Sequence, residues 1–85
     1  MSAAIMETQL LANLRGDAVL AARGCVAERL PAGGIAIARG AHHRGIWAWQ
    51  SSRFMFTPGG YREPTAAVDS VAEAVIHTRT VICAS

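Results

Sequence analysis

Aromatic residues alternate with smaller or polar ones along Trp47-Ala48-Trp49-Gln50-Ser51-Ser52-Arg53-Phe54-Met55-Phe56. Successive side chains of a β-strand point to opposite faces, so Trp47 and Trp49 share one face. An antiparallel hairpin whose turn is centred on the Ser-Ser pair sets Trp49 opposite Phe54. It also sets Trp47 opposite Phe56, and all four rings then lie on the same side. The stretch therefore predicts a hairpin with one aromatic face.

The register of this hairpin is strongly specified even though its turn signal is weak. Neither serine favours a positive φ as Gly or Asn does, but a four-residue loop with the same centre keeps the same pairing. A slip of one residue would replace the two phenylalanines on the aromatic face by Arg53, Met55 and Thr57. We therefore expect the ring pairing to hold whichever loop is used.

The preceding segment, residues 34–39, predicts a neighbouring strand with Ile35 and Ile37 on the aromatic face. A five-residue loop over residues 40–44 would set Ile37 opposite Trp47 and Ile35 opposite Trp49. Small and apolar side chains occupy the reverse face instead of the polar ones that a solvated face normally carries. A helix, a loop or another subunit is expected to cover them, and they form the predicted self-association face: Ala36, Ala38, Ile46, Ala48 and Met55.

The C-terminal part predicts a turn, a short strand and a helix. A Pro-Gly-Gly sequence ends the third strand, and residues 61–68 suggest an edge strand that Pro64 would interrupt. Ser70 and Glu73 have the spacing of a capping box, in which each side chain bonds the other's backbone amide. Apolar residues then recur at helical spacing over residues 71–83. We expect this helix to pack on the aromatic face with the stripe Val71, Ala74, Val75, Thr78, Val81 and Ile82.

The N-terminal third is expected to be helical. Met6, Leu10 and Leu14 recur every fourth residue, and Gly16 is a suitable stop. Asp17 can cap a second helix that continues to about residue 30. The alternative is a short strand over residues 18–22, because an apolar run of that length is ambiguous.

The 85 residues predict one domain, over residues 1–85. No apolar stretch approaches the roughly 20 residues that span a bilayer, so no membrane contact is expected. The start lacks the basic residue and long apolar run of a secretory signal. Cys25 and Cys83 are too few and too far apart in sequence to indicate a disulfide framework. These observations together predict a cytoplasmic protein.

Positive charge is concentrated in the middle of the chain. Residues 29–62 contain five Arg and no acid, whereas the rest has three Arg and six acids, which gives +5 and −3 for the net of +2. Such asymmetry can mark an anion-binding or nucleic-acid-binding surface, or the arginines can pair with acids of the folded domain. The candidate contacts for nucleic acid or another anion are Arg39, His42, His43, Arg44, Arg53 and Arg62.

Catalytic and metal-binding motifs are nearly absent. Gly33-Gly34 lacks the spacing of a phosphate-binding loop, and the two adjacent histidines have no partner at zinc-ligand spacing. Glu73 and His77 are one helical turn apart and near Ser70. The cap already accounts for Ser70 and Glu73, so they do not indicate a nucleophile and its base. No cofactor is expected.

These patterns together predict an α+β domain. It has an N-terminal helical segment, a three- to four-stranded antiparallel β-meander and a C-terminal helix packed on the sheet. The predicted function is a small non-enzymatic interaction or assembly module that forms a homo-oligomer, a dimer in the simplest case. Two alternatives stay open: binding of nucleic acid or another anion through the basic residues, and a small enzyme whose site forms between subunits.

Overall fold

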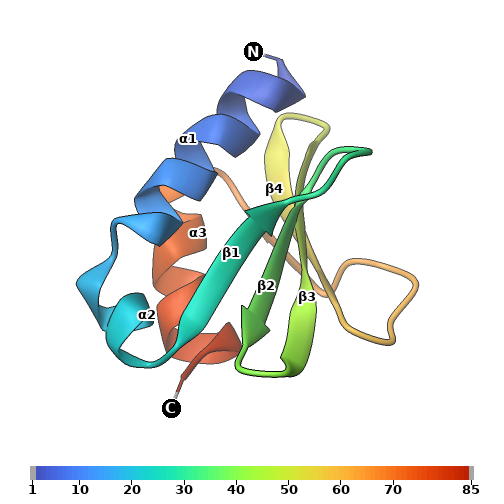
Figure 1. Ribbon diagram of the computed structural model, residues 1–85. Coiled ribbons are helices and arrows are strands. Elements are labelled where there is room, and N and C mark those ends of the chain that lie inside the picture. Colours follow the sequence, from blue (N-terminus) through green and yellow to red (C-terminus); the bar gives the residue numbers. More distant parts are fainter. Residues whose placement is uncertain (1, 85) are drawn as a thin grey trace.

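The computed structural model describes residues 2–84 as a layer of helices packed on one face of a β-sheet (Figure 1). Two helices, α1 (Ala3–Arg15) and α3 (Val71–His77), lie on the same side of the sheet. The short helix α2 (Ala18–Ala22) lies beside the first strand, and a π-helical turn, η1 (Thr78–Ile82), continues α3. The predicted α+β class, with the C-terminal helix on the sheet, is confirmed.

The sheet has five antiparallel strands in the order β1-β2-β3-β4-β5, one more than the longest predicted meander. Their bounds are β1 (Cys25–Arg29), β2 (Ile35–Arg39), β3 (His42–Gln50), β4 (Arg53–Pro58) and β5 (Ala66–Val68). The short strand β5 falls within the segment predicted as an edge strand. The strand that was not predicted is β1.

The aromatic hairpin of β3 and β4 has the predicted register. Trp47 pairs with Phe56, and Trp49 pairs with Phe54. The connection is a two-residue turn, because Ser51 and Ser52 adopt positive φ angles of 53° and 60°. Such a turn matches the twist of the strands. Pairing of the rings outweighs the poor local preference of serine for this conformation.

The predicted register between β2 and β3 is wrong by two residues. Ile35 pairs with Trp47, and Ile37 pairs with Gly45. The turn is shorter than the predicted loop, and a bulge leaves Arg44 without a partner on β2. A shift of two residues keeps each side chain on its predicted face, so both isoleucines still lie under the helices.

The predicted second helix ends early. Asp17 caps α2 as expected, through a hydrogen bond from the Leu20 amide at 3.0 Å. Gly24 then adopts a positive φ of 73° and redirects the chain. The following residues pair with β2 from Cys25 opposite Arg39 to Arg29 opposite Ile35, as strand β1. Tertiary pairing with an exposed strand edge overrides the near-helical spacing of the apolar residues here.

The core lies between the helices and the aromatic face. Its buried side chains include Met6, Leu10 and Leu14 of α1 and Ala74 and Val75 of α3. Trp47 is fully buried, and its indole N–H donates to the Thr78 hydroxyl at 3.0 Å. That hydroxyl donates in turn to the Ala74 carbonyl at 2.7 Å. The indole N–H, the hydroxyl and the carbonyl of this hydrogen-bonded series each have a partner, as buried polar groups require.

The C-terminal helix begins at its predicted cap but changes character near its end. The Ser70 hydroxyl accepts from the Glu73 amide at 3.1 Å and donates to the Glu73 carboxylate at 3.2 Å, so half of the expected capping box forms. The π turn η1 holds more residues per turn than an α-helix and shifts the apolar stripe. Val81, predicted to face the core, is 61% exposed for this reason, and Cys83 is buried.

A buried carboxylate joins α1 to one end of the sheet. Glu7 is only 4% exposed. One of its oxygens accepts from the Gly34 amide at 2.8 Å, and the other accepts from the Trp49 amide at 3.0 Å. Both amides lie beyond the last pair between β2 and β3, Ile35 with Trp47, so pairing between these strands does not satisfy them. Glu7 therefore acts as a cap on the sheet.

Replacing Glu7 by alanine is expected to lower the free energy of unfolding by about 3 kcal/mol. The change removes two charge-assisted hydrogen bonds and leaves two backbone donors without a partner. Urea unfolding followed by tryptophan fluorescence measures the effect. The control is Glu28→Ala on the exposed side of β1, which is expected to change stability by less than about 0.5 kcal/mol. Equal losses in the two variants would contradict the capping role.

Candidate functional site

The sheet face that points away from the helices carries small and apolar side chains at its centre. No helix among residues 2–84 covers it, because α1 and α3 both lie on the aromatic side. Strand pairing sets Ala36 opposite Ile46 and Ala48 opposite Met55, so the predicted residues meet on this face. We call the apolar part of this surface the open face; its members are Val26, Ala36, Ala38, Ile46, Ala48, Met55 and Ala67. Glu28, opposite Ala36, and Thr57, opposite Ile46, lie on the same side and border it.

Two members of the open face were absent from the predicted set. Val26 pairs with Ala38 and is 54% exposed. Ala67 pairs with Met55 across β4 and β5. Val26 was missed because its segment was expected to be helical, and Ala67 because Pro64 obscured the last strand. Together they extend the apolar surface from one edge of the sheet to the other.

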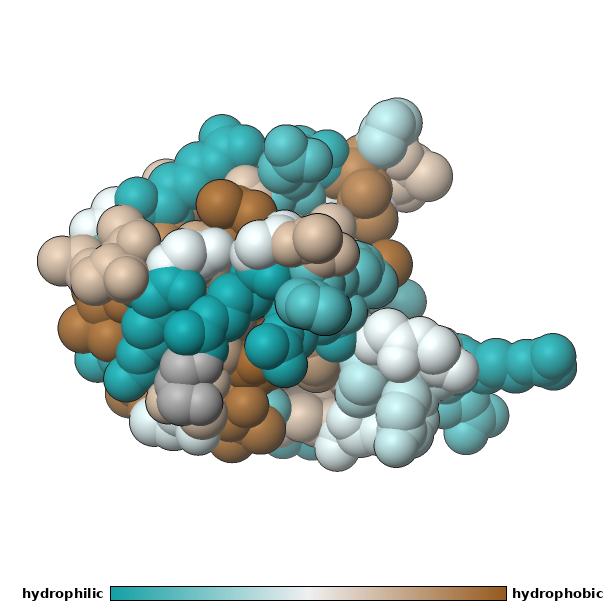
Figure 2. Space-filling model, turned by 60° about the horizontal axis from the view of Figure 1, so that its bottom comes forward, coloured by the Kyte–Doolittle hydropathy of each residue, from teal (hydrophilic) through white to brown (hydrophobic). Residues whose placement is uncertain are grey.

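A projecting loop borders the open face. The arm (residues 59–65) joins β4 to β5 and stands out from the sheet in Figure 1. In Figure 2 polar residues project from the same side of the molecule. A groove of about 480 Å³ separates the arm from the sheet, with Met55 and Ala67 on one wall and Glu63 and Pro64 on the other. The open face therefore ends in a shallow groove beside the arm.

The basic candidate residues do not form one continuous surface. Arg39, His42 and His43 flank the tight β2–β3 turn, and Arg44 follows in the bulge. Arg53 lies at the opposite end of the sheet, where β4 begins after the Ser51–Ser52 turn. Its guanidinium pairs with the Asp69 carboxylate at 2.8 Å. Arg62 lies in the arm. Four of the six residues thus gather in one hairpin, and the other two lie elsewhere.

Ser70, Glu73 and His77 do not converge on one site in the structure. Ser70 and Glu73 bond to each other at the start of α3. The His77 ring lies 5.7 Å from the Trp47 ring and 6.3 Å from the Phe56 ring, centroid to centroid. His77 therefore packs on the aromatic cluster instead of approaching the Ser70 hydroxyl. Among residues 2–84, no three His, Cys, Asp or Glu side chains group as metal ligands.

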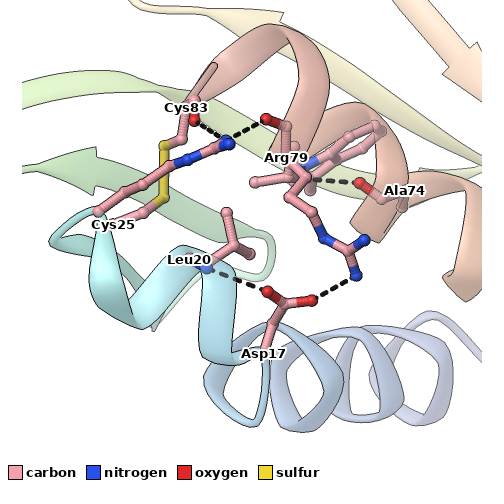
Figure 3. Close-up of a disulfide and its surroundings, with 9 residues drawn as sticks. Asp17, Leu20, Cys25, Ala74, Arg79 and Cys83 are labelled. Atoms are coloured by element: carbon pink, nitrogen blue, oxygen red, sulfur yellow. Dashed lines mark hydrogen bonds and ion pairs between the residues drawn. A yellow bond between two sulfur atoms is a disulfide. The ribbon is translucent and has the colours of Figure 1, made fainter. Parts of the chain in front are cut away.

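A disulfide joins the two ends of the helical layer (Figure 3). Cys25 begins β1, and Cys83 follows η1; their Cα atoms lie 6.5 Å apart despite a sequence separation of 58. The sequence analysis did not predict this bond, because the two cysteines are far apart in sequence; the fold removes that separation. Disulfides persist mainly in oxidising compartments. The cysteines therefore do not favour a cytoplasmic location, which was one of the arguments for that prediction.

Two arginines form polar contacts close to this disulfide. The Arg23 guanidinium donates to the carbonyl oxygens of Arg79 and Cys83 at 2.6 and 2.8 Å, where the C-terminal helix leaves carbonyls without helical partners (Figure 3). Arg79 reaches in the other direction and pairs with Asp17 at 2.6 Å. We call this set of five residues the C-terminal clamp: Asp17, Arg23, Cys25, Arg79 and Cys83.

The clamp is expected to weaken in acid. The Leu20 amide and then the Arg79 guanidinium hold the pKa of Asp17 below its ordinary value of 3.8. A carboxyl whose pKa is lower in the folded state stabilises the fold above its unfolded pKa. That stabilisation disappears as the pH falls through the folded pKa. We expect the free energy of unfolding to fall between about pH 5 and pH 2, with a smaller fall in Asp17→Asn. Urea titrations across this pH range measure both proteins. An equal fall in Asp17→Asn would show that Asp17 is not the source of the acid sensitivity.

Comparisons with known proteins suggest no function for this protein. No protein-family model, curated protein or solved structure matches this chain. Among the described residues, no helix is long and apolar enough to cross a membrane.

Proposed function

We propose that this protein is an assembly module that forms a homodimer through its open face. The observation that supports this proposal is the apolar surface across all five strands, which has no covering element within residues 2–84. Antiparallel sheets that face water normally alternate to polar residues on that side. Here alanine, isoleucine and methionine take the central positions, with Glu28 and Thr57 at the border, and a second copy of the same flat face would exclude water from the apolar part of both.

The size of the open face limits how tightly two copies can bind. Five strands about 4.8 Å apart span roughly 20 Å, and three outward positions along β3 cover roughly 13 Å. The patch is therefore on the order of 300 Å² in projection, whereas stable interfaces bury about 800 Å² per partner. The arm and its groove must add area. We expect dissociation in the micromolar range and not an obligate dimer.

Replacing Ala48 by glutamate is expected to abolish the dimer and leave the fold intact. The substitution sets a charge at the centre of the open face of both copies, where it is desolvated and faces its own symmetry mate. Sedimentation velocity at 1–100 micromolar, on the order of the expected dissociation constant, measures the change. The matched control is Ala12→Glu on the exposed side of α1, which adds the same charge away from the interface. A wild-type monomer across this range, or equal effects of the two variants, would contradict the proposal.

The other two functions have less support from the arrangement of residues. Nucleic-acid binding would use the basic residues of the β2–β3 hairpin. Arg53, however, lies at the far end of the sheet and is paired with Asp69. An enzyme would need convergent polar groups, and Ser70 and His77 lie in different surroundings. Self-association therefore remains the function that the geometry supports best.

A further inference from the structure

Three elements meet at a small pocket on the helix side of the sheet. The bulge of β3, helix α3 and the end of the arm supply the polar groups, from Arg44, His77 and Thr65. Phe56, Pro58 and Ile82 supply apolar walls, and the volume is about 230 Å³. These residues lie up to 38 positions apart in the sequence, from residue 44 to residue 82, so only the fold brings them together.

The bulge explains why Arg44 lines this pocket. Regular alternation along β3 would place Arg44 with Ile46 and Ala48 on the open face. Because the register shifts between Ile37 and Ala38, Arg44 faces no residue of β2, and it lines the pocket beside His77 and Phe56. The Gly59 amide donates to the Arg44 carbonyl at 2.9 Å and holds this backbone against the start of the arm.

His77 is held in place by aromatic packing. Its ring meets Trp47 nearly edge to face, with an interplanar angle of 80°, and lies beside Phe56. Among the described residues, no hydrogen bond or ion pair joins the side chain of His77 or of Arg44 to another group. Glu73, one helical turn before His77, bonds instead to Ser70. Both basic side chains are thus available to a ligand.

Thr65 completes the polar rim. Its amide donates to the Phe56 carbonyl at 2.9 Å, which fixes the end of the arm beside the pocket. Its hydroxyl can donate to an anion or accept from a neighbouring group. Among residues 2–84, no acidic side chain lines the pocket. The rim therefore presents donors and positive charge above an apolar floor.

We infer that this pocket binds a small organic anion. A carboxylate or phosphate head accepts hydrogen bonds from Arg44, Thr65 and His77, since guanidinium groups match the oxygens of such anions. The apolar part of the ligand lies against Phe56 and Ile82. The volume is below the roughly 300 Å³ at which drug-sized sites begin, and it accommodates a group about the size of a single substituted ring. The pocket lies across the sheet from the open face, so this inference does not depend on self-association.

Calorimetric titration with benzoate and phenyl phosphate tests the inference. Both anions are expected to bind with saturation, and neutral benzyl alcohol is expected to bind at least about tenfold more weakly, because charge-assisted hydrogen bonds supply most of the affinity. Arg44→Gln is expected to weaken anion binding by about tenfold or more. Arg62→Gln removes the same charge from the arm and is expected to change the affinity by less than about twofold. Thr65→Val and His77→Gln are expected to give intermediate losses, with folding verified by circular dichroism.

Several outcomes would overturn the anion site. Benzyl alcohol binding as tightly as benzoate would mean that the apolar floor acts alone. Equal losses in Arg44→Gln and Arg62→Gln would mean a diffuse charge effect. Absence of binding by either anion at low salt would remove the site altogether. The Ala48→Glu variant separates this inference from the proposed dimer, since it is expected to bind benzoate with unchanged affinity even where it is monomeric.

Discussion

Replacing Gly45 by alanine is expected to lower the free energy of unfolding by about 4 kcal/mol. A Cβ atom at this position would lie 2.5 Å from both the Phe56 ring and the Thr57 carbonyl oxygen. The φ of 153° is also one that side-chain-bearing residues rarely adopt. Overpacking of a core costs roughly 1–3 kcal/mol, and a strained backbone conformation costs roughly as much again. Urea unfolding followed by tryptophan fluorescence measures the loss.

Gly40→Ala is the matched control for this prediction. Gly40 also has a positive φ, of 60°, but a Cβ there would meet no atom within 4 Å. This variant is expected to lose only about 1 kcal/mol, from the conformational cost alone. If Gly45→Ala were no worse than Gly40→Ala, the close approach of β3 to Phe56 and Thr57 would be refuted. The register around the bulge would then need to be revised.

Replacing Cys83 by serine is expected to cost about 4 kcal/mol. The disulfide closes a loop with a sequence separation of 58, and loop-closure entropy predicts this magnitude for the unfolded chain. The loss is large relative to the roughly 4–13 kcal/mol expected for a domain of this length. The variant is expected to be partly unfolded near physiological temperature. Denaturation measured by circular dichroism at several urea concentrations gives the value.

Reduction of the wild type supplies the control for the disulfide. Dithiothreitol is expected to lower wild-type stability by about the same amount and to leave the Cys25→Ser/Cys83→Ser double variant unchanged. This comparison separates loss of the covalent bond from burial of a serine hydroxyl. Insensitivity of the wild type to reductant, with Ellman's reagent detecting two thiols in the native protein, would refute the disulfide.

The central hairpin was predictable from sequence because its rings repeat with a period of two. Four rings on one face specify both the register and the side that faces the core, so the Ser51–Ser52 turn adapts to them. The caps at Asp17 and Ser70 were predictable for a related reason. A short polar side chain before an apolar helical pattern has few other local partners.

The features that the sequence did not predict depend on long-range contacts. Strand β1 resembles a helix in its apolar spacing, and only pairing with β2 decides its conformation. The Glu7 cap joins residues 27 and 42 positions apart. The disulfide likewise requires that η1 return to the start of β1. No local sequence pattern indicates any of these contacts, because the residues around each partner do not show which distant residue it will meet.

The candidate surfaces also divide into one that follows from a local sequence pattern and one that depends on long-range contacts. The five predicted residues of the open face are adjacent because they follow from strand alternation, which a register shift of two preserves. The pocket of Arg44, Thr65 and His77 was not predictable. It arises where one bulge leaves Arg44 without a partner on β2, and a bulge leaves no clear trace in a single sequence.

Methyl NMR spectra over a dilution series test the proposed assembly most directly. The helical side also exposes apolar residues, Ile76 at 53% and Val81 at 61%, and it is therefore the competing contact surface. We expect the methyl signals of Ile46, Ala48 and Met55 to shift with concentration and those of Ile76 and Val81 to stay constant. Shifts confined to Ile76 and Val81, or no shift up to the millimolar range, would contradict assembly through the open face.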